Sequence, residues 1–375
     1  MRIPYTQLLG GMSPEQFMAE YWQKKPLLVR QAVPNFQGLI KSEELQALAC
    51  REDAVSRLVE FKKNKWNLET GPFDAKRWAK LAESWTLLVQ NVNHFSQAAA
   101  ELFYSFDFIS HARLDDLQIS LSPAEGGIGP HLDSYDVFLL QAQGRKNWQI
   151  SHPDDVSLIP DAPLKILSKF EPEAEWVLEP GDMLYLPPGV AHCGTALEAG
   201  MTYSIGFRAP ETQELANEFL SFIQDNLDVE GRYADGDLAP AKHPAALDPA
   251  MCQRVLEMLK AIEWDQAKVT DFMGCYLTDP KPHVFFEGPK RPMSATAFVK
   301  KMAELGIRLD LKTQLLFSGE HFYCNGDAFD ASGEEAQWLV QLADQRYLPP
   351  GLYSDILLGW LYEQYTLGVV ELNRG

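Results

Sequence analysis

The sequence predicts an α+β protein with a β-rich core between a helical start and a helical end. Three observations support this fold class. Short strand patterns separated by glycine and proline fill roughly residues 113–208, whereas helical periods dominate on both sides, and the last 88 or so residues combine helices with a hairpin. We therefore expect three domains, over residues 1–210, 211–287 and 288–375.

The N-terminal part begins with a well-marked helix. Ser13 suits the N-cap, Pro14 suits the first helical position, and an acidic residue follows in the first turn. The apolar run Leu27–Val29 then predicts a strand. The next expected elements are a helix after Ser42, a buried strand over Trp85–Val92 and a helix over Ser96–Phe103.

The central part predicts many short strands with turn signals between them, which is typical of a sandwich or a small barrel. The expected strands are Leu117–Ser122, Val137–Gln143, Lys146–Ser151, Trp176–Leu178, Met183–Leu186 and Met201–Phe207. After Pro210 the apolar period changes from two to nearly four. Helices are expected around Leu215–Ile223, Pro249–Ile262 and Gln266–Tyr276, with a linker or long loop over residues 231–249.

The C-terminal part predicts the helix-and-hairpin content of a winged helix. A helix over Ala295–Leu305 precedes a hairpin, and two more helices follow it. The hairpin strands are Gln314–Phe317 and His321–Cys324, and the later helices are Glu334–Asp344 and Leu352–Tyr365.

The overall composition excludes several classes of protein. Asp and Glu total 52 against 33 Lys and Arg, a formal net charge of −19, which argues against direct nucleic-acid binding and favours a basic partner. No apolar run approaches a membrane span, and the first residues lack a signal-peptide core. Five scattered cysteines without a CxxC pair argue against disulfides and a thiolate zinc site, so we expect a cytoplasmic protein.

A metal site is predicted by two segments 58 or so residues apart. His131 and Asp133 are two residues apart, so on a strand their side chains leave the same face. A later segment runs from Gly181 through Pro187 to His192, and it offers a third ligand after a turn and a short apolar strand. Two histidines and one carboxylate form the facial triad that holds Fe(II) and leaves coordination positions open.

The spacing of the second segment fits the return motif of a cupin-type double-stranded β-helix. Ordinary cupins add a second histidine and a glutamate to the ligand set, but here those positions are Asp133 and Val137. Only three protein ligands remain, whereas structural zinc takes four. Cys193 is expected to point away from the metal because adjacent strand residues face opposite sides.

These motifs, with Trp22–Pro26 and Tyr203–Pro210, resemble the JmjC-type 2-oxoglutarate oxygenases. Within them, the chain is similar to bacterial ribosomal oxygenases that hydroxylate an arginine of large-subunit ribosomal protein sixteen. The resemblance implies Fe(II), 2-oxoglutarate and O₂, hydroxylation at the arginine β-carbon, a homodimer formed by the helical region, and a C-terminal winged helix.

A cation must hold the far carboxylate of 2-oxoglutarate, and strand alternation chooses between two neighbours. Lys146 shares a face with Trp148 and Ile150, whereas Arg145 lies on a wholly polar face. The resemblance implies Lys or Arg at position 146, where close relatives tend to have Arg. A lysine binds a carboxylate as a point charge, whereas an arginine can form two parallel hydrogen bonds to it.

Further residues are assigned to the co-substrate by the resemblance alone. It implies that Ser122 contacts 2-oxoglutarate, although Ser120 is expected on the same strand face. Ser204 is a second candidate, on the last strand of the barrel.

Two alternatives stay open at the substrate end. Asp115 and Asp116 can pair with a substrate guanidinium, or they are solvated acids at a strand end. Two other functions also stay open. One is a JmjC oxygenase acting as a histidine hydroxylase or an N-methyl-lysine demethylase; the other is a non-catalytic cupin-like binding or regulatory module.

Overall fold

The computed structural model describes residues 3–373, and packing divides the chain into two compact units. The first unit comprises the described chain up to Ala209, with Pro280–Thr313 and the described chain from Asp344 onward. The second comprises Pro210–Asp279 and Gln314–Ala343. Within residues 3–373, no helix has the length and apolar character needed to cross a bilayer. This division cuts across the segment 288–375, and the three-domain boundaries stay a prediction.

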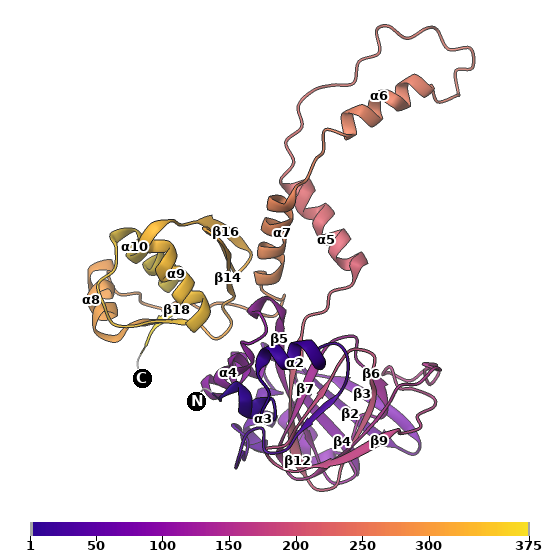
Figure 1. Ribbon diagram of the computed structural model, residues 1–375, viewed down its shortest axis with the longest axis vertical. Helices are drawn as coiled ribbons and strands as arrows, with labels where there is room; N and C mark the ends of the chain where they lie inside the picture. Colours follow the sequence, from indigo (N-terminus) through magenta and orange to yellow (C-terminus); the bar gives the residue numbers. More distant parts are fainter. Residues whose placement is uncertain (1–2, 374–375) are drawn as a thin grey trace. The chain divides into compact units, whose positions relative to one another are not determined.

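The first unit contains two facing sheets, which confirms the predicted double-stranded β-helix, or jelly-roll, core (Figure 1). The larger sheet has the strand order β1-β10-β7-β12-β5-β4-β2-β3, and the smaller has β6-β11-β8-β9. The strands are β1 (Leu27–Val29), β2 (Ser56–Lys62), β3 (Lys65–Thr70), β4 (Ser84–Val89), β5 (Leu114–Ser122), β6 (His131–Leu132), β7 (Val137–Gln143), β8 (Lys146–Ser151), β9 (Ala174–Leu178), β10 (Met183–Leu186), β11 (Ala191–Ala196) and β12 (Gly200–Phe207).

The continuous apolar run of β7 arises because both faces of this strand are buried. Phe138 and Leu140 join the core that contains Phe17, on the helix-covered face of the larger sheet. Val137 and Leu139 belong to a second apolar cluster, which includes Trp148 and Ile150 of the smaller sheet. Alternate residues of one strand therefore fill two cores. The covering helices are α1 (Tyr5–Leu8), α2 (Pro14–Glu20), α3 (Ser42–Leu48) and α4 (Gln97–Phe103).

Local signals set the ends of these elements. Ser13 caps α2 as predicted, with its hydroxyl accepting from the Gln16 backbone N–H at 3.2 Å. The sequence did not predict the β2–β3 hairpin, which widens the larger sheet. Its turn residues Lys63 and Asn64 both have positive φ, as a type I′ turn requires, but without the glycine that usually marks such a turn.

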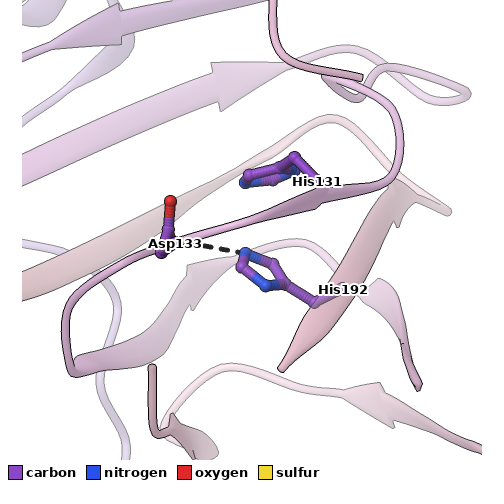
Figure 2. Close-up of side chains that lie close together, drawn as sticks. All are labelled: His131, Asp133 and His192. Carbon is purple, nitrogen blue, oxygen red and sulfur yellow. Dashed lines mark ion pairs between the residues drawn. The ribbon is translucent and has the colours of Figure 1, made fainter. Parts of the chain in front are cut away.

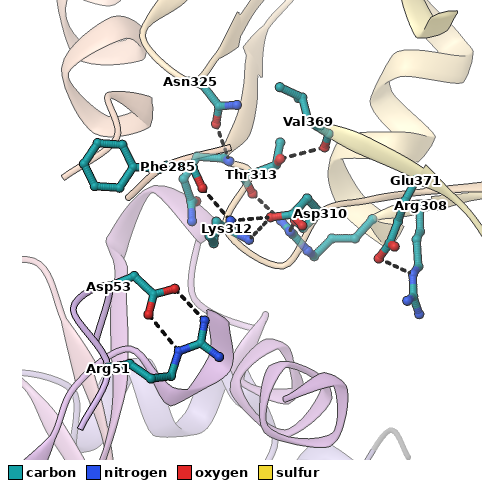
Figure 3. A network of polar contacts seen from close by, with 12 residues as sticks. Arg51, Asp53, Phe285, Arg308, Asp310, Lys312, Thr313, Asn325, Val369 and Glu371 are labelled. Carbon is teal, nitrogen blue, oxygen red and sulfur yellow. Dashed lines mark hydrogen bonds and ion pairs between the residues drawn. The ribbon is translucent and has the colours of Figure 1, made fainter. Parts of the chain in front are cut away.

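The C-terminal part of the first unit holds α8 (Ala295–Leu305), α10 (Asp355–Leu367) and the three-stranded sheet β17-β13-β18. Its strands are β13 (Ile307–Leu309), β17 (Tyr347–Leu348) and β18 (Val370–Leu372). Arg308 donates to Glu371 at 2.9 Å, and the Thr313 hydroxyl donates to the Val369 carbonyl at 2.7 Å (Figure 3). These strands are too short to give a sequence pattern, so they were not predicted.

The second unit combines helices with a small antiparallel sheet. It contains α5 (Thr212–Asp225), α6 (Pro249–Leu259), α7 (Gln266–Thr278) and the strands β14 (Leu315–Ser318), β15 (His321–Cys324) and β16 (Asp327–Asp330). Helix α9 (Gly333–Gln345) follows the sheet. Gly274 lets α7 approach the Tyr323 ring, because an added Cβ would lie 2.3 Å from it. The Tyr323 hydroxyl also donates to Asp271 at 2.8 Å.

Candidate metal centre and active site

The structure brings His131, Asp133 and His192 together as predicted (Figure 2). His192 lies directly opposite His131 in the β11–β6 pair, and Asp133 follows β6 by one residue. One ligand atom from each side chain lies within 4.8 Å of the other two. His192 Nε2 is 3.6 Å from Asp133 Oδ2, and the two imidazole centroids are 4.2 Å apart.

Backbone carbonyls orient both imidazoles toward a common point. His131 Nδ1 lies 2.9 Å from the Gly129 carbonyl, and His192 Nδ1 lies 3.1 Å from the Val190 carbonyl. A proton on each Nδ1 satisfies these contacts and leaves Nε2 as the ligand atom. Burial, followed by the nearby His131, lowers the pKa of His192 to about 3. The imidazole is therefore neutral at physiological pH, which is the form that binds a metal.

The donor set fits an open metal site better than a closed one. Within residues 3–373, the clustered metal-binding group has three members, one carboxylate and two imidazoles. Burial raises the pKa of Asp133 although His131, Tyr135 and Arg57 act in the opposite direction, and a bound divalent ion would supply further positive charge. Three ligands on one side leave coordination positions for a bidentate co-substrate and O₂.

A cavity of about 490 Å³ lies beside the triad, between the two sheets. Lys146 lines the part of the cavity that we call the floor. It lies on β8, four residues before Ile150, and Ile150 pairs with His192. Asp115 and Asp116 line the cavity from the start of β5, where Asp116 pairs with Gly206, and we call this part of the cavity the mouth. Other polar lining residues include Arg57, Thr86, Gln118, Ser120, Tyr135, Thr202 and Ser204.

Lys146 points inward, as the strand alternation predicted. It is only 7% exposed, whereas Arg145 is exposed and pairs with Glu198 at 2.7 Å. The Lys146 ammonium lies 4.7 Å from the centroid of the Trp148 ring, and Gly194 leaves room for both side chains. Burial lowers the pKa of Lys146 to about 8, because its charge is desolvated. The cavity floor is therefore a buried cationic site that suits a carboxylate.

Comparisons with known proteins match both halves of the chain. A JmjC domain family matches residues 101–215, and a ROXA-like winged helix family matches residues 261–361. The ribosomal protein uL16 3-hydroxylase of Escherichia coli is 34% identical over 345 residues, which cover 91% of each chain. This chain belongs to the JmjC ribosomal oxygenases. The winged helix and the 2-oxoglutarate oxygenase class expected from the sequence are thereby confirmed.

Solved structures extend this likeness to the whole fold of the ribosomal oxygenase. An X-ray structure of E. coli YcfD is 31% identical, covers 96% of this chain and 98% of its own, and has a TM-score of 0.85. A second YcfD structure, in complex with cobalt and 2-oxoglutarate, has the same identity, covers 97% and 99%, and has a TM-score of 0.82. That E. coli protein thus binds cobalt together with 2-oxoglutarate.

The two serines predicted to contact 2-oxoglutarate lie in different surroundings. Ser122 is 3% exposed, lies 2.9 Å from the Thr86 hydroxyl, and is not among the cavity-lining residues. Ser204 does line the cavity, as does Ser120, the alternative on the Ser122 face. Contacts of Ser122 and Ser204 with the co-substrate stay predictions.

The two acidic residues at the mouth of this ribosomal oxygenase differ sharply. Asp115 lies 2.8 Å from the Lys281 ammonium and 3.7 Å from Arg208. Asp116 is 8% exposed, and its Oδ2 atom is buried without a hydrogen-bond partner. Burial, with a contribution from Asp115, raises the pKa of Asp116 to about 6. The interpretation as solvated strand-end acids is therefore wrong for Asp116.

Sequence reasoning missed Arg57 and Gln118 among the polar residues of the cavity. Arg57 comes from β2 and donates to Gln118 at 3.3 Å. Arg57 alternates with Val59 along β2, and both line the cavity. That period of two was the available signal, but the charged turn after β2 hid the hairpin.

Proposed function

We propose that this ribosomal oxygenase hydroxylates the β-carbon of an arginine in ribosomal protein uL16, using Fe(II), 2-oxoglutarate and O₂. The observation that carries the proposal is the polarity of the cavity. A buried cation, Lys146, and a buried carboxylate, Asp116, one oxygen of which has no hydrogen-bond partner, both line the cavity beside the triad. The first suits the far carboxylate of 2-oxoglutarate, and the second suits a guanidinium.

Each residue then has a defined task. His131, Asp133 and His192 would hold Fe(II), which supplies O₂ activation when 2-oxoglutarate is bound; succinate, CO₂ and the hydroxylated side chain are the products. Lys146 binds and orients the far carboxylate. Asp116 accepts from the target guanidinium and so places the β-carbon near the metal.

Two lines of support favour uL16 over other targets. The E. coli relative is named for uL16 3-hydroxylation, and the similarity covers nearly the full length of both chains. The formal net charge of −19 also favours a basic protein partner. A cytoplasmic location and little direct binding to nucleic acid are part of the same proposal.

We also propose a homodimer formed through the helices of the second unit. Apolar side chains remain exposed on α5 and α6, at Leu220 (60%), Leu256 (46%) and Leu259 (56%). A monomer in sedimentation at micromolar concentration would contradict this assembly.

The deciding experiment is mass spectrometry of uL16 after incubation with the protein, Fe(II), 2-oxoglutarate and O₂. A gain of one oxygen on an arginine is expected. The same gain on a histidine, or the loss of methyl groups from a lysine, would assign a different JmjC reaction. If anaerobic Fe(II) and 2-oxoglutarate also gave no charge-transfer absorption, the non-catalytic binding module would be favoured.

A further inference from the structure

The connection between β8 and β9 folds into a hairpin over residues 156–168, which we call the lip hairpin. The Ile159 N–H donates to the Ile166 carbonyl and the Ser168 N–H donates to the Ser157 carbonyl, both at 2.8 Å. Leu158 lies opposite Leu167 between these bonds. The lip hairpin is therefore an ordered two-armed structure.

The inner arm of the lip hairpin is joined to the active site. Residues 163–166 line the cavity. The Leu167 N–H donates at 2.8 Å to the carbonyl of Pro130, the residue before the ligand His131. Ile166 is 1% exposed and lies close to Gly129, where an added Cβ would be 3.2 Å from its methyl group. The lip hairpin is thus built onto the segment that carries a metal ligand.

The outer arm exposes apolar side chains. Val156 is 54% exposed, Leu158 45% and Ile159 37%, so three of four consecutive residues present apolar surface. Single exposed apolar residues are common, but a contiguous group beside a cavity marks an interaction surface.

Charged residues around the outer arm are mostly acidic. Residues 152–173 contain two lysines, Lys165 and Lys169, and five acidic residues, which are Asp154, Asp155, Asp161, Glu171 and Glu173. Hydrogen bonds from Ser157, followed by Lys169, lower the pKa of Asp155 to about 2, so it stays ionised. An apolar centre with an acidic rim is complementary to a basic protein with an apolar contact residue.

We propose that the lip hairpin is a docking surface for the substrate protein and binds the chain segment that flanks the target side chain. This inference rests on the proposed function, because it takes its partner, a basic ribosomal protein, from there. Continuity with the cavity and the acidic rim identify the occupant. A protein that inserts one side chain at the mouth must place its neighbouring residues against the surrounding surface.

The test compares two double variants with closely matched side-chain exposure. Leu158→Ser with Ile159→Ser removes apolar surface from the lip hairpin. Leu197→Ser with Val177→Ser is the control, because Leu197 is 44% and Val177 37% exposed and neither lines the cavity. The KM of the full-length protein for recombinant uL16 is measured by mass spectrometry, together with the KM for 2-oxoglutarate.

The lip variant is expected to raise the KM for uL16 by about tenfold, a typical loss for apolar contact area of this size. Its kcat at saturating uL16 and its KM for 2-oxoglutarate stay at the wild-type value, and the control variant changes neither KM. Independently of turnover, amide exchange of residues 156–159 slows when uL16 is added.

Three results would count against the docking surface. If wild-type protein hydroxylates uL16 and both double variants have its KM, docking at the lip hairpin is wrong while the proposed function stands. If wild-type protein leaves uL16 unmodified, the proposed function fails and the docking claim fails with it. If the lip variant changes the sedimentation coefficient, the surface contacts a second copy of this chain, and the proposal is overturned.

Discussion

The floor and the mouth of the cavity carry buried side chains of opposite charge, Lys146 and Asp116. At the floor, Lys146 is buried without an ion pair in the described part of the chain. At the mouth, Asp116 is buried without a hydrogen bond to one of its oxygens, while Asp115 beside it is paired with Lys281. Unpaired buried charge is costly, so each end favours a ligand that supplies the missing counter-charge.

The largest loss of activity is expected from substitution of a metal ligand. His192→Ala removes one of the three metal ligands. Loss of a residue that only hydrogen-bonds to a metal ligand typically lowers activity by roughly 10–100-fold, so turnover of 2-oxoglutarate should fall by more than that. Turnover is measured as succinate formation, with and without uL16. His321→Ala is the control, because it removes an imidazole that does not line the cavity. Substantial turnover in the His192 variant would refute the ligand assignment.

The next largest effect concerns the floor alone. Lys146→Met should raise the KM for 2-oxoglutarate by about 10–100-fold, since a hydrogen bond to a charged group contributes about 1.5–3 kcal/mol. The KM for uL16 should not change. Arg145→Met is the matched control, because Arg145 is the adjacent cation but faces solvent. Equal effects of the two substitutions would show that the cavity does not bind its co-substrate at the floor.

At the mouth, a substitution should affect the KM for uL16 instead of the KM for 2-oxoglutarate. Asp116→Asn should raise the KM for uL16 by about tenfold or more and leave the KM for 2-oxoglutarate unchanged. Asp115→Asn should have a smaller effect, because the charge of Asp115 is already countered by Lys281 and Arg208. If Asp115→Asn raised the KM for uL16 more than Asp116→Asn does, Asp115 would be the residue that binds the target guanidinium.

The smallest expected effect is on the pH dependence of kcat/KM, which should differ between 2-oxoglutarate and uL16. The pKa of Lys146 is lowered to about 8, so the free protein loses this cation as pH rises, and kcat/KM for 2-oxoglutarate should decline above pH 8. The pKa of Asp116 is raised to about 6, so kcat/KM for uL16 should improve as pH rises through 6. Lys146→Arg should abolish the alkaline decline, because guanidinium stays protonated there. A decline that persists in this variant would have another origin.

Much of the site could be predicted because its signals are local in the sequence. The two-residue spacing of His131 and Asp133, and the Gly181–His192 segment, carry backbone requirements that a short stretch of chain reveals. Strand alternation likewise separated Lys146 from Arg145, and the structure confirms their opposite orientations. In contrast, the hairpin β2–β3 and its Arg57 were missed, because their turn lacks the usual glycine.

The sequence by itself determined the metal-ligand set, the inward cation and the family, because these depend on spacing and strand period. Only the tertiary structure decided which of the two carboxylates at the mouth is held in an ion pair. Lys281, 166 residues along the chain, pairs with Asp115 and leaves Asp116 without such a partner. Such long-range pairing depends on how distant segments pack, and no local pattern encodes it.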